Sequence, residues 1–219
     1  MAEIISQKSV NIPLDSVVLE GDLSFPLELH AMVIFAHGSG SSRLSPRNRL
    51  VAQKLNEAGI GTLLFDLLTR HEDADYENRF NLPLLTERLE AATQWLKSQP
   101  QTEGLPVGYF GASTGAAAAL MAAADFGDKI GAVVSRGGRP DLAKNVLHKV
   151  LSPVLLIVGG DDTVVIGLNR FAYNLISAEK DMKIVPGATH LFEEPGTLEE
   201  AARLAAGWFR QYLFSGIGV

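Results

Sequence analysis

Hydrophobic and polar positions follow two alternating patterns along this 219-residue chain. Short apolar runs bounded by Gly, Pro or polar clusters predict strands, and segments with a helical period lie between them. The predicted strands are residues 6–12, 17–25, 31–36, 61–65, 106–110, 130–135, 154–158 and 182–185. The predicted helices are residues 46–58, 84–98, 114–124, 141–147, 167–177 and 197–214. Strands that alternate with helices in this way indicate an α/β fold.

The strands after the first two are almost continuously apolar, as in MVIFA, GTLLF and VLLIV. Parallel strands that helices cover on both faces have this composition. The first two runs are expected to form an opening antiparallel pair. We therefore predict a mostly parallel sheet of about eight strands with helices on both faces.

Local signals refine the boundaries of these elements. Gly59 is a good stop for the helix before it, and Thr197 with Glu200 has the spacing of a capping box. Residues 69–82 are polar and have no clear period, so they either border the active site as a lid or are simply solvated.

Composition narrows the class of protein. Hydrophobic residues make up 47% of the chain and charged residues 20%, which is typical of a globular protein rather than a disordered or membrane protein. A chain of this length can bury about 70–75% of its unfolded surface in one core. We predict a single domain over residues 1–219. The net charge of −6, without a run of Lys or Arg, argues against nucleic acid as a partner.

Two further features limit chemistry and location. The chain has no cysteine, so any covalent catalysis must use another nucleophile. The start, MAEIISQKSVNIPLD, lacks a basic segment followed by an apolar one, and the apolar run at 116–124 is shorter than the roughly 18 residues that a membrane helix needs. We expect a cytoplasmic protein with no membrane partner.

The strongest motif is Gly111-Ala112-Ser113-Thr114-Gly115, which follows an apolar strand and opens an Ala-rich helix. The pattern G-x-S-x-G between a strand and a helix is typical of the nucleophile turn of an α/β-hydrolase fold. We expect this fold to carry little or no cap domain here. Small residues are needed because the serine sits on a tight, strained turn. The alternative is that Ser113 only caps the helix.

Two later strands end in residues that could complete a triad. Asp161 and Asp162 follow the strand at 154–158, and His190 follows the strand at 182–185, so the order Ser, Asp, His fits the fold. A histidine would take the serine proton, and a carboxylate would orient the ring. The alternatives are a loop histidine bonded to backbone and aspartates that serve a turn. Residue types alone do not choose between Asp161 and Asp162.

The segment after the third strand reads His37-Gly38-Ser39-Gly40, where this fold supplies its second oxyanion donor. We predict that the backbone N–H groups of Ser39 and Thr114 form the oxyanion hole, and that His37 braces the loop. The rival interpretation is a phosphate-binding turn of the pattern G-x-G-x-x-G, which fails where Arg43 replaces the third glycine.

The sequence resembles the dienelactone-hydrolase-like branch of the α/β-hydrolases, a group of small bacterial proteins sometimes fused to phosphoribosyltransferase domains. The likeness covers nearly the whole chain and includes HGSGSSRLSPRNR (37–49), GYFGASTGAAAAL (108–120), LLIVGGDD (155–162) and VPGATHLFEEPGTLEE (185–200). In that family's pattern the acid is the second Asp after the Gly pair, which implies Asp162. Dienelactone hydrolase itself uses a cysteine nucleophile, so Ser113 implies an esterase-like member rather than dienelactone turnover.

Several arginines should reach the carboxyl edge of the sheet, where this fold binds ligands. We hypothesise that Arg43 or Arg136 meets an anionic group of the substrate, because the guanidinium fork suits carboxylate or phosphate. Structural pairing with neighbouring acids is the alternative for both.

Other ligands are not expected. The cluster at residues 71–75 (His71, Glu72, Asp73 and Asp75) fits no metal-ligand template and reads as a solvated loop, so we expect neither a metal nor a cofactor. The expected activity is hydrolysis of a carboxylic ester, thioester or lactone, with a small ester-type molecule as partner. The alternative is a non-catalytic binding or regulatory protein on the same fold.

Overall fold

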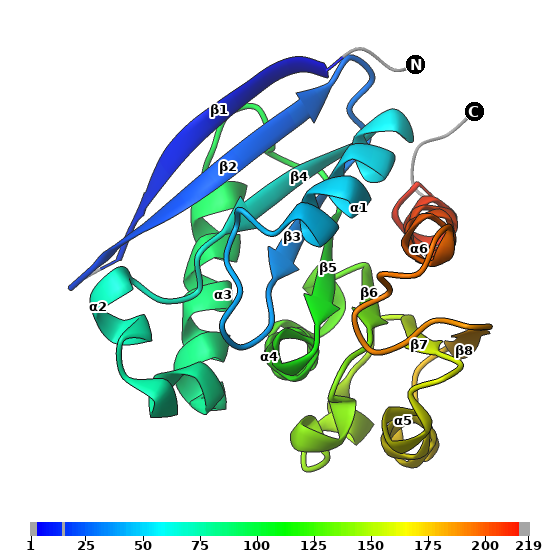
Figure 1. The fold of residues 1–219 in the computed structure, drawn as a ribbon. Coiled ribbons are helices and arrows are strands. Elements are labelled where there is room, and N and C mark those ends of the chain that lie inside the picture. The colour runs from blue at the N-terminus through cyan, green and yellow to red at the C-terminus, as the bar shows by residue number, and fades with distance from the viewer. Residues whose placement is uncertain (1–3, 15, 215–219) are drawn as a thin grey trace.

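The computed structural model describes residues 4–14 and 16–214. These residues form one sheet of eight strands in the order β1-β2-β4-β3-β5-β6-β7-β8 (Figure 1). The strands are β1 (Ile4–Pro13), β2 (Val18–Pro26), β3 (Ala31–Ala36), β4 (Ile60–Phe65), β5 (Val107–Ala112), β6 (Ala132–Arg136), β7 (Val154–Gly159) and β8 (Lys180–Val185). β2 pairs antiparallel with both β1 and β4, and the other neighbouring pairs are parallel.

Helices cover both faces of this sheet. They are α1 (Pro46–Glu57), α2 (Arg70–Asp73), α3 (Leu82–Lys97), α4 (Thr114–Phe126), α5 (Thr163–Leu175) and α6 (Thr197–Leu213), with short 3-10 turns at Tyr76–Phe80, Gly127–Lys129, Pro140–Ala143 and Leu147–Lys149. α1 and α6 lie on one side of the sheet, and α3, α4 and α5 lie on the other (Figure 1).

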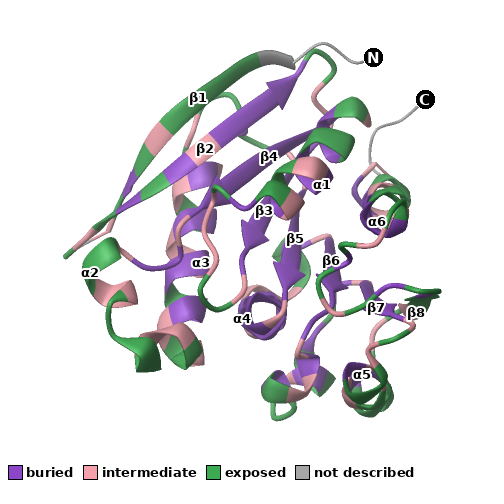
Figure 2. Ribbon diagram, viewed as in Figure 1, coloured by how far each residue is buried: buried purple, intermediate pink, exposed green. Residues whose placement is uncertain are grey.

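The core is therefore divided into two layers by the sheet. Leu89 of α3 and Leu120 of α4 pack in one layer, and Leu55 of α1 and Phe209 of α6 pack in the other. The central strands are buried along their whole length, while β1 and the outer faces of the helices are largely exposed (Figure 2). Burial on both faces explains why these strands read as continuous apolar runs.

The predicted eight-stranded α/β architecture is confirmed, and each strand lies within two residues of its predicted ends. Gly59, with a φ of 81°, follows the end of α1 as expected. No helix among residues 4–14 and 16–214 is long and apolar enough to cross a membrane.

Two predicted helices differ in the structure. Instead of an α-helix at 141–147, the structure has two separate 3-10 turns, Pro140–Ala143 and Leu147–Lys149. So short a segment gains few intrahelical hydrogen bonds, and Arg139 holds the Asp141 carboxylate at its start. α5 begins at Thr163, four residues before its predicted start, although the run Thr-Val-Val-Ile has low helix propensity. Burial of Val165 in the first turn outweighs that preference.

The predicted capping box at Thr197 is wrong. Gly196, with a φ of 81°, occupies the cap position, and the Thr197 hydroxyl donates to the carbonyl of Glu194. A capping box is found instead at Thr69 and Glu72, at the start of α2. Glu72 also forms a 2.8 Å ion pair with Arg88 of α3, so the polar segment at 69–82 is packed onto the domain by its charged residues.

Candidate active site

Ser113 lies on the tight turn between β5 and α4 in a strained backbone conformation. Its φ of 50° and ψ of −124° fall in a region that L-residues rarely adopt. It stands at the cap position of α4, but its side chain makes no capping hydrogen bond. The alternative that Ser113 serves only as a helix cap therefore does not fit the structure.

The glycines around Ser113 allow this turn to form. A Cβ on Gly115 would lie 2.2 Å from the carbonyl oxygen of Ala36, and one on Gly111 would lie 2.4 Å from the Cα of Ala116. Both distances are far below van der Waals contact. Only glycine therefore lets α4 approach β3 and β5 closely enough to hold the serine in place.

His190 and Asp162 are joined by a short hydrogen bond. His190 Nδ1 lies 2.7 Å from Asp162 Oδ2, and the two side chains are 40% and 14% exposed. Asp161 is exposed, and its backbone N–H donates to the carbonyl of Ala188. The structure thus brings Asp162, and not Asp161, to the histidine. The bond to Nδ1 leaves Nε2 as the nitrogen that is free to accept a proton.

Ser113 and His190 line one cleft of about 250 Å³. Its walls come from four loops and the start of α1: Gly38, Ser39, Ser41, Ser45, Arg47, Asn48, Ala112, Ser113, Arg136, Gly137, His190 and Leu191. Among the described residues, no hydrogen bond joins the Ser113 hydroxyl to His190. Such contacts are often long in a free enzyme and shorten when substrate binds.

The predicted oxyanion donors, the N–H groups of Ser39 and Thr114, lie near each other but differ in whether they already have an acceptor. The Thr114 N–H begins α4, where an N–H has no acceptor within the helix. The Ser39 N–H donates to the Thr114 hydroxyl at 2.9 Å. The two N–H groups are therefore not both available to an oxyanion, because that of Ser39 already donates a hydrogen bond.

His37 is buried beneath this loop and bonded at both ring nitrogens. Nδ1 lies 3.0 Å from the carbonyl of Gly38, and Nε2 accepts the N–H of Leu67 at 3.0 Å. Burial lowers the pKa of His37 below its ordinary value of 6.5, and the nearby carboxylates of Asp66 and Asp73 only partly oppose this effect. A neutral ring tied to backbone on both sides fits the predicted bracing role.

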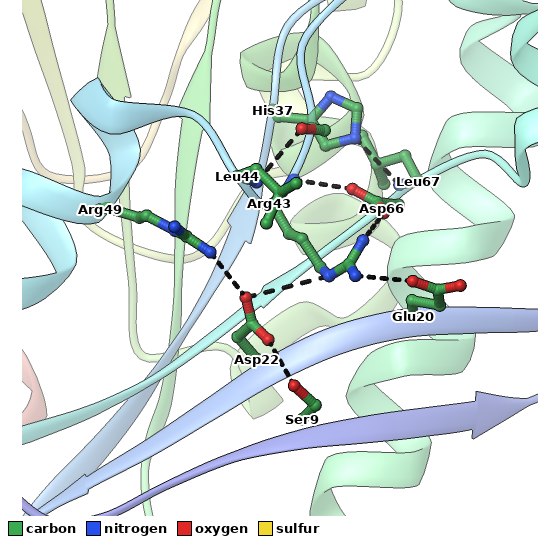
Figure 3. A network of polar contacts seen from close by, with 10 residues as sticks. Ser9, Glu20, Asp22, His37, Arg43, Leu44, Arg49, Asp66 and Leu67 are labelled. Atoms are coloured by element: carbon green, nitrogen blue, oxygen red, sulfur yellow. Dashed lines mark hydrogen bonds and ion pairs between the residues drawn. The ribbon is translucent and has the colours of Figure 1, made fainter.

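Arg43 does not reach the cleft, and the prediction that it binds substrate needs correction. Its guanidinium pairs with Asp66 and lies 2.6 Å from Glu20 Oε2 and 3.9 Å from Asp22 Oδ2, as Figure 3 shows. Its backbone N–H also donates to Asp66 Oδ1 at 2.7 Å. Arg43 is therefore a structural residue that links the loop after β3 to β2 and to the end of β4.

Arg136 does line the cleft, and it is only 5% exposed. Its partners are distant: Nη1 lies 3.5 Å from the carbonyl of Leu191, and Nη2 lies 3.4 Å from Asn48 Oδ1. Its Nε atom is buried without a partner. Burial lowers the pKa of Arg136 to about 10, and the positive charge of Arg47 adds to this effect.

Two residues near His190 contribute to the site but are not indicated by any sequence motif. Phe192 has a φ of 57°, is buried, and places its ring centroid 5.6 Å from the Arg136 guanidinium. Glu193 forms a 2.8 Å ion pair with Arg47 across the edge of the cleft. The signal available in the sequence is their position two and three residues after His190. A positive φ or a pairing 146 residues away cannot be read from a pattern.

The acidic cluster at residues 71–75 has structural partners. Glu72 pairs with Arg88, and Asp73 pairs with Arg79 at 2.9 Å. In the part of the chain that the structure describes, no group of three or more acidic or histidine side chains could hold a metal ion.

The sequence was also compared with known protein families. The sequence model of the dienelactone hydrolase family matches residues 22–215, which is most of the chain. The chain belongs to the dienelactone hydrolase family. Membership in this family supports a hydrolase and confirms the resemblance seen in the sequence motifs.

A solved member of the dienelactone hydrolase family has nearly the same structure. The dienelactone hydrolase from Anabaena variabilis is 50% identical, with a TM-score of 0.92 over 95% of this chain and 98% of that one. Est1E from Butyrivibrio proteoclasticus shares the fold at 18% identity, with a TM-score of 0.80 over 93% of this chain and 98% of that one.

Curated relatives come from two strains of Mycobacterium tuberculosis. Each is 54% identical over 209 residues, and each is provisionally named a phosphoribosyl transferase. The match covers 95% of this chain but 47% of the relatives. The chain therefore spans about half the length of the curated relatives that it matches.

Proposed function

We propose that this chain is a serine hydrolase that cleaves a carboxylic ester, thioester or lactone through an acyl-enzyme on Ser113. The observation that carries the proposal is the 2.7 Å hydrogen bond that His190 Nδ1 donates to Asp162 Oδ2, because His190 shares a cleft with Ser113. Serine on its own is a weak nucleophile at neutral pH, and this arrangement supplies the base it needs.

In the proposed reaction His190 Nε2 takes the proton of the Ser113 hydroxyl as Oγ attacks the carbonyl carbon. The tetrahedral intermediate collapses, the bond to the leaving oxygen or sulfur breaks, and His190 returns the proton to that atom. Water, activated by His190, then attacks the acyl-enzyme and releases the acid. Asp162 keeps the proton on Nδ1 and stabilises the imidazolium form.

The negative oxygen of the intermediate would be held by the N–H groups of Thr114 and Ser39. The N-terminus of α4 adds its positive dipole end at the same place. For Ser39 this requires an exchange, because its N–H is bonded to the Thr114 hydroxyl in the free protein. A hydrogen bond to an oxyanion is about twice as strong as one to a neutral hydroxyl, so the exchange is favourable.

The size of the cleft favours small substrates. A volume of about 250 Å³ lies below the roughly 300–1,000 Å³ typical of pockets for drug-sized ligands. We therefore expect p-nitrophenyl acetate and butyrate to be hydrolysed faster than long-chain esters. Phosphoribosyl transfer is named for relatives about twice as long, and we do not assign it to the part that this chain covers.

Labelling with a fluorophosphonate probe tests the proposal directly. We expect one covalent adduct at Ser113, found by peptide mass spectrometry, and none in Ser113→Ala. The variant should remain folded, because alanine is smaller than serine and the Ser113 side chain makes no capping hydrogen bond that would be lost. A folded protein without the adduct and without turnover of any ester would favour a binding or regulatory protein on this fold instead.

A further inference from the structure

Arg136 is a buried cation for which the described part of the chain supplies no anionic partner. No carboxylate of these residues lies within 4.0 Å of its guanidinium, its Nε atom has no hydrogen bond, and its two other contacts are 3.4 and 3.5 Å long. Every other arginine that lines the cleft or follows β6 has a carboxylate partner. Burying a charge without compensation is costly, so a residue left in this state points to a ligand that completes it.

The surroundings of Arg136 favour a negatively charged ligand. Of the residues that the structure describes, Arg47, Arg136 and His190 are the ionisable ones in the cleft wall, and none of the wall residues is a carboxylate. The Asn48 side-chain oxygen and the ring of Phe192 lie beside the guanidinium. The guanidinium lines the same cleft as Ser113.

We propose that Arg136, together with Arg47 and Asn48, forms an anion subsite that binds a carboxylate or phosphate group of the substrate. This inference rests on the proposed hydrolase function and names the substrate class: esters that carry a second, negatively charged group. The planar guanidinium can donate two parallel hydrogen bonds to such a group, and the Asn48 amide can donate another.

Glu193 holds part of this subsite in the free protein. It occupies Arg47 through a contact in which the two side chains are 61% and 32% exposed. Exposed ion pairs of this kind contribute little to stability. An anionic substrate can therefore displace Glu193 from Arg47 at small cost, after which both guanidinium groups face the substrate.

Matched esters test the subsite by kinetics. p-Nitrophenyl butyrate is neutral, whereas mono-p-nitrophenyl succinate replaces its terminal methyl group with a carboxylate, and the 3-phosphonopropanoate ester carries a phosphonate. A second pair, p-nitrophenyl acetate and its 3-carboxy derivative, places the charge on the leaving group. We expect the wild type to prefer the charged member of at least one pair, and the first set separates carboxylate from phosphate recognition.

Arg136→Gln should lower kcat/KM for the preferred anionic ester about 10- to 100-fold more than it lowers kcat/KM for the matched neutral ester. Arg136→Lys, which keeps the charge but loses the fork, should lie between. Glu193→Gln should lower KM for the anionic ester only. Arg43→Gln is the matched control, because Arg43 lies outside the cleft and should affect both esters equally. Equal losses for both esters in Arg136→Gln would refute the subsite.

A binding measurement separates this inference from the proposed reaction and does not depend on Arg136 variants folding. In Ser113→Ala, monoethyl succinate should raise the melting temperature more than ethyl butyrate at equal ionic strength. Selective binding of monoethyl succinate, without ester turnover or labelling of the wild type, would support the subsite and refute the hydrolase proposal. Turnover of the esters with no preference for the charged member of either pair, and with no selective binding, would refute the subsite and leave the hydrolase proposal intact.

Discussion

Asp161 and Asp162 are neighbours in the chain but have different surroundings. Asp162 is 14% exposed and bonded to His190, whereas Asp161 is exposed on the turn before α5. We predict that Asp162→Asn lowers kcat for an ester by about 10⁴-fold, because the amide favours the wrong histidine tautomer. Asp161→Asn should change kcat by less than about three-fold. Steady-state kinetics on p-nitrophenyl acetate compares the two, and a larger loss in Asp161→Asn would exchange their roles.

His37 leads to a prediction about pH. Its ring is neutral when it accepts the Leu67 N–H, and its pKa in the folded protein is lowered by burial. The unfolded chain therefore binds a proton more readily, so stability is complete above the ordinary pKa of 6.5 and decreases as the pH falls from there toward the lower folded pKa. Denaturant unfolding at about pH 7.5 and about pH 5 measures this loss. The loss should be smaller in His37→Gln, and an equal loss would show that other groups cause it.

For single residues, the sequence predicts the roles that follow from position along the chain. It does not predict the roles that follow from burial and from partners distant in the chain. Ser113 and His190 could be placed because a nucleophile turn and the loop after the last strand are fixed points of the fold. Asp162 required a family resemblance, and the geometry agrees with it. The sequence does not distinguish Arg43 from Arg136, because their partners are set by the fold. In the folded chain Arg43 meets three carboxylates, whereas Arg136 meets none among the described residues.

Among the elements, α4 depends most on close approach to the sheet. Gly115→Ala would place a methyl group 2.2 Å from the Ala36 carbonyl, so we predict a loss of at least about 2 kcal/mol in the free energy of unfolding. Gly207 of α6 is the matched control, because no described atom beyond its chain neighbours and the backbone of its own helix lies within 4 Å of the position of its Cβ. Gly207→Ala should stabilise the protein by about 0.5–1 kcal/mol through its higher helix propensity. Urea unfolding of both variants measures the difference. A stable Gly115→Ala protein would show that α4 can move away from β3.

The elements that sequence predicted least well are those whose ends are set by tertiary contacts. Strands were recognised because burial on both faces leaves a simple apolar run. The β-branched residues at the start of α5 suggest an extended chain, so the pattern predicts a helix that begins too late. For the 3-10 turns after β6 the apolar spacing predicts an α-helix, because it does not record the Arg139–Asp141 contact.

For the whole molecule, two tryptophans report on opposite layers of the core. Trp95 of α3 packs against one layer and Trp208 of α6 against the other. We propose that the chain is a single domain, so the variants Trp95→Phe and Trp208→Phe should each unfold with one midpoint that is the same by tryptophan fluorescence and by far-UV circular dichroism. Two distinct midpoints within one variant would mean that the layers unfold independently.

The positive φ of Ser113 has an effect on how this fold can change over time. Holding a residue other than glycine in that conformation costs about 1–3 kcal/mol, so a glycine at position 113 would make the protein more stable while removing its nucleophile. Selection for stability alone would therefore remove the serine. A protein that keeps Ser113 is less stable than its glycine variant, and this loss of stability is retained only where the hydroxyl contributes to function.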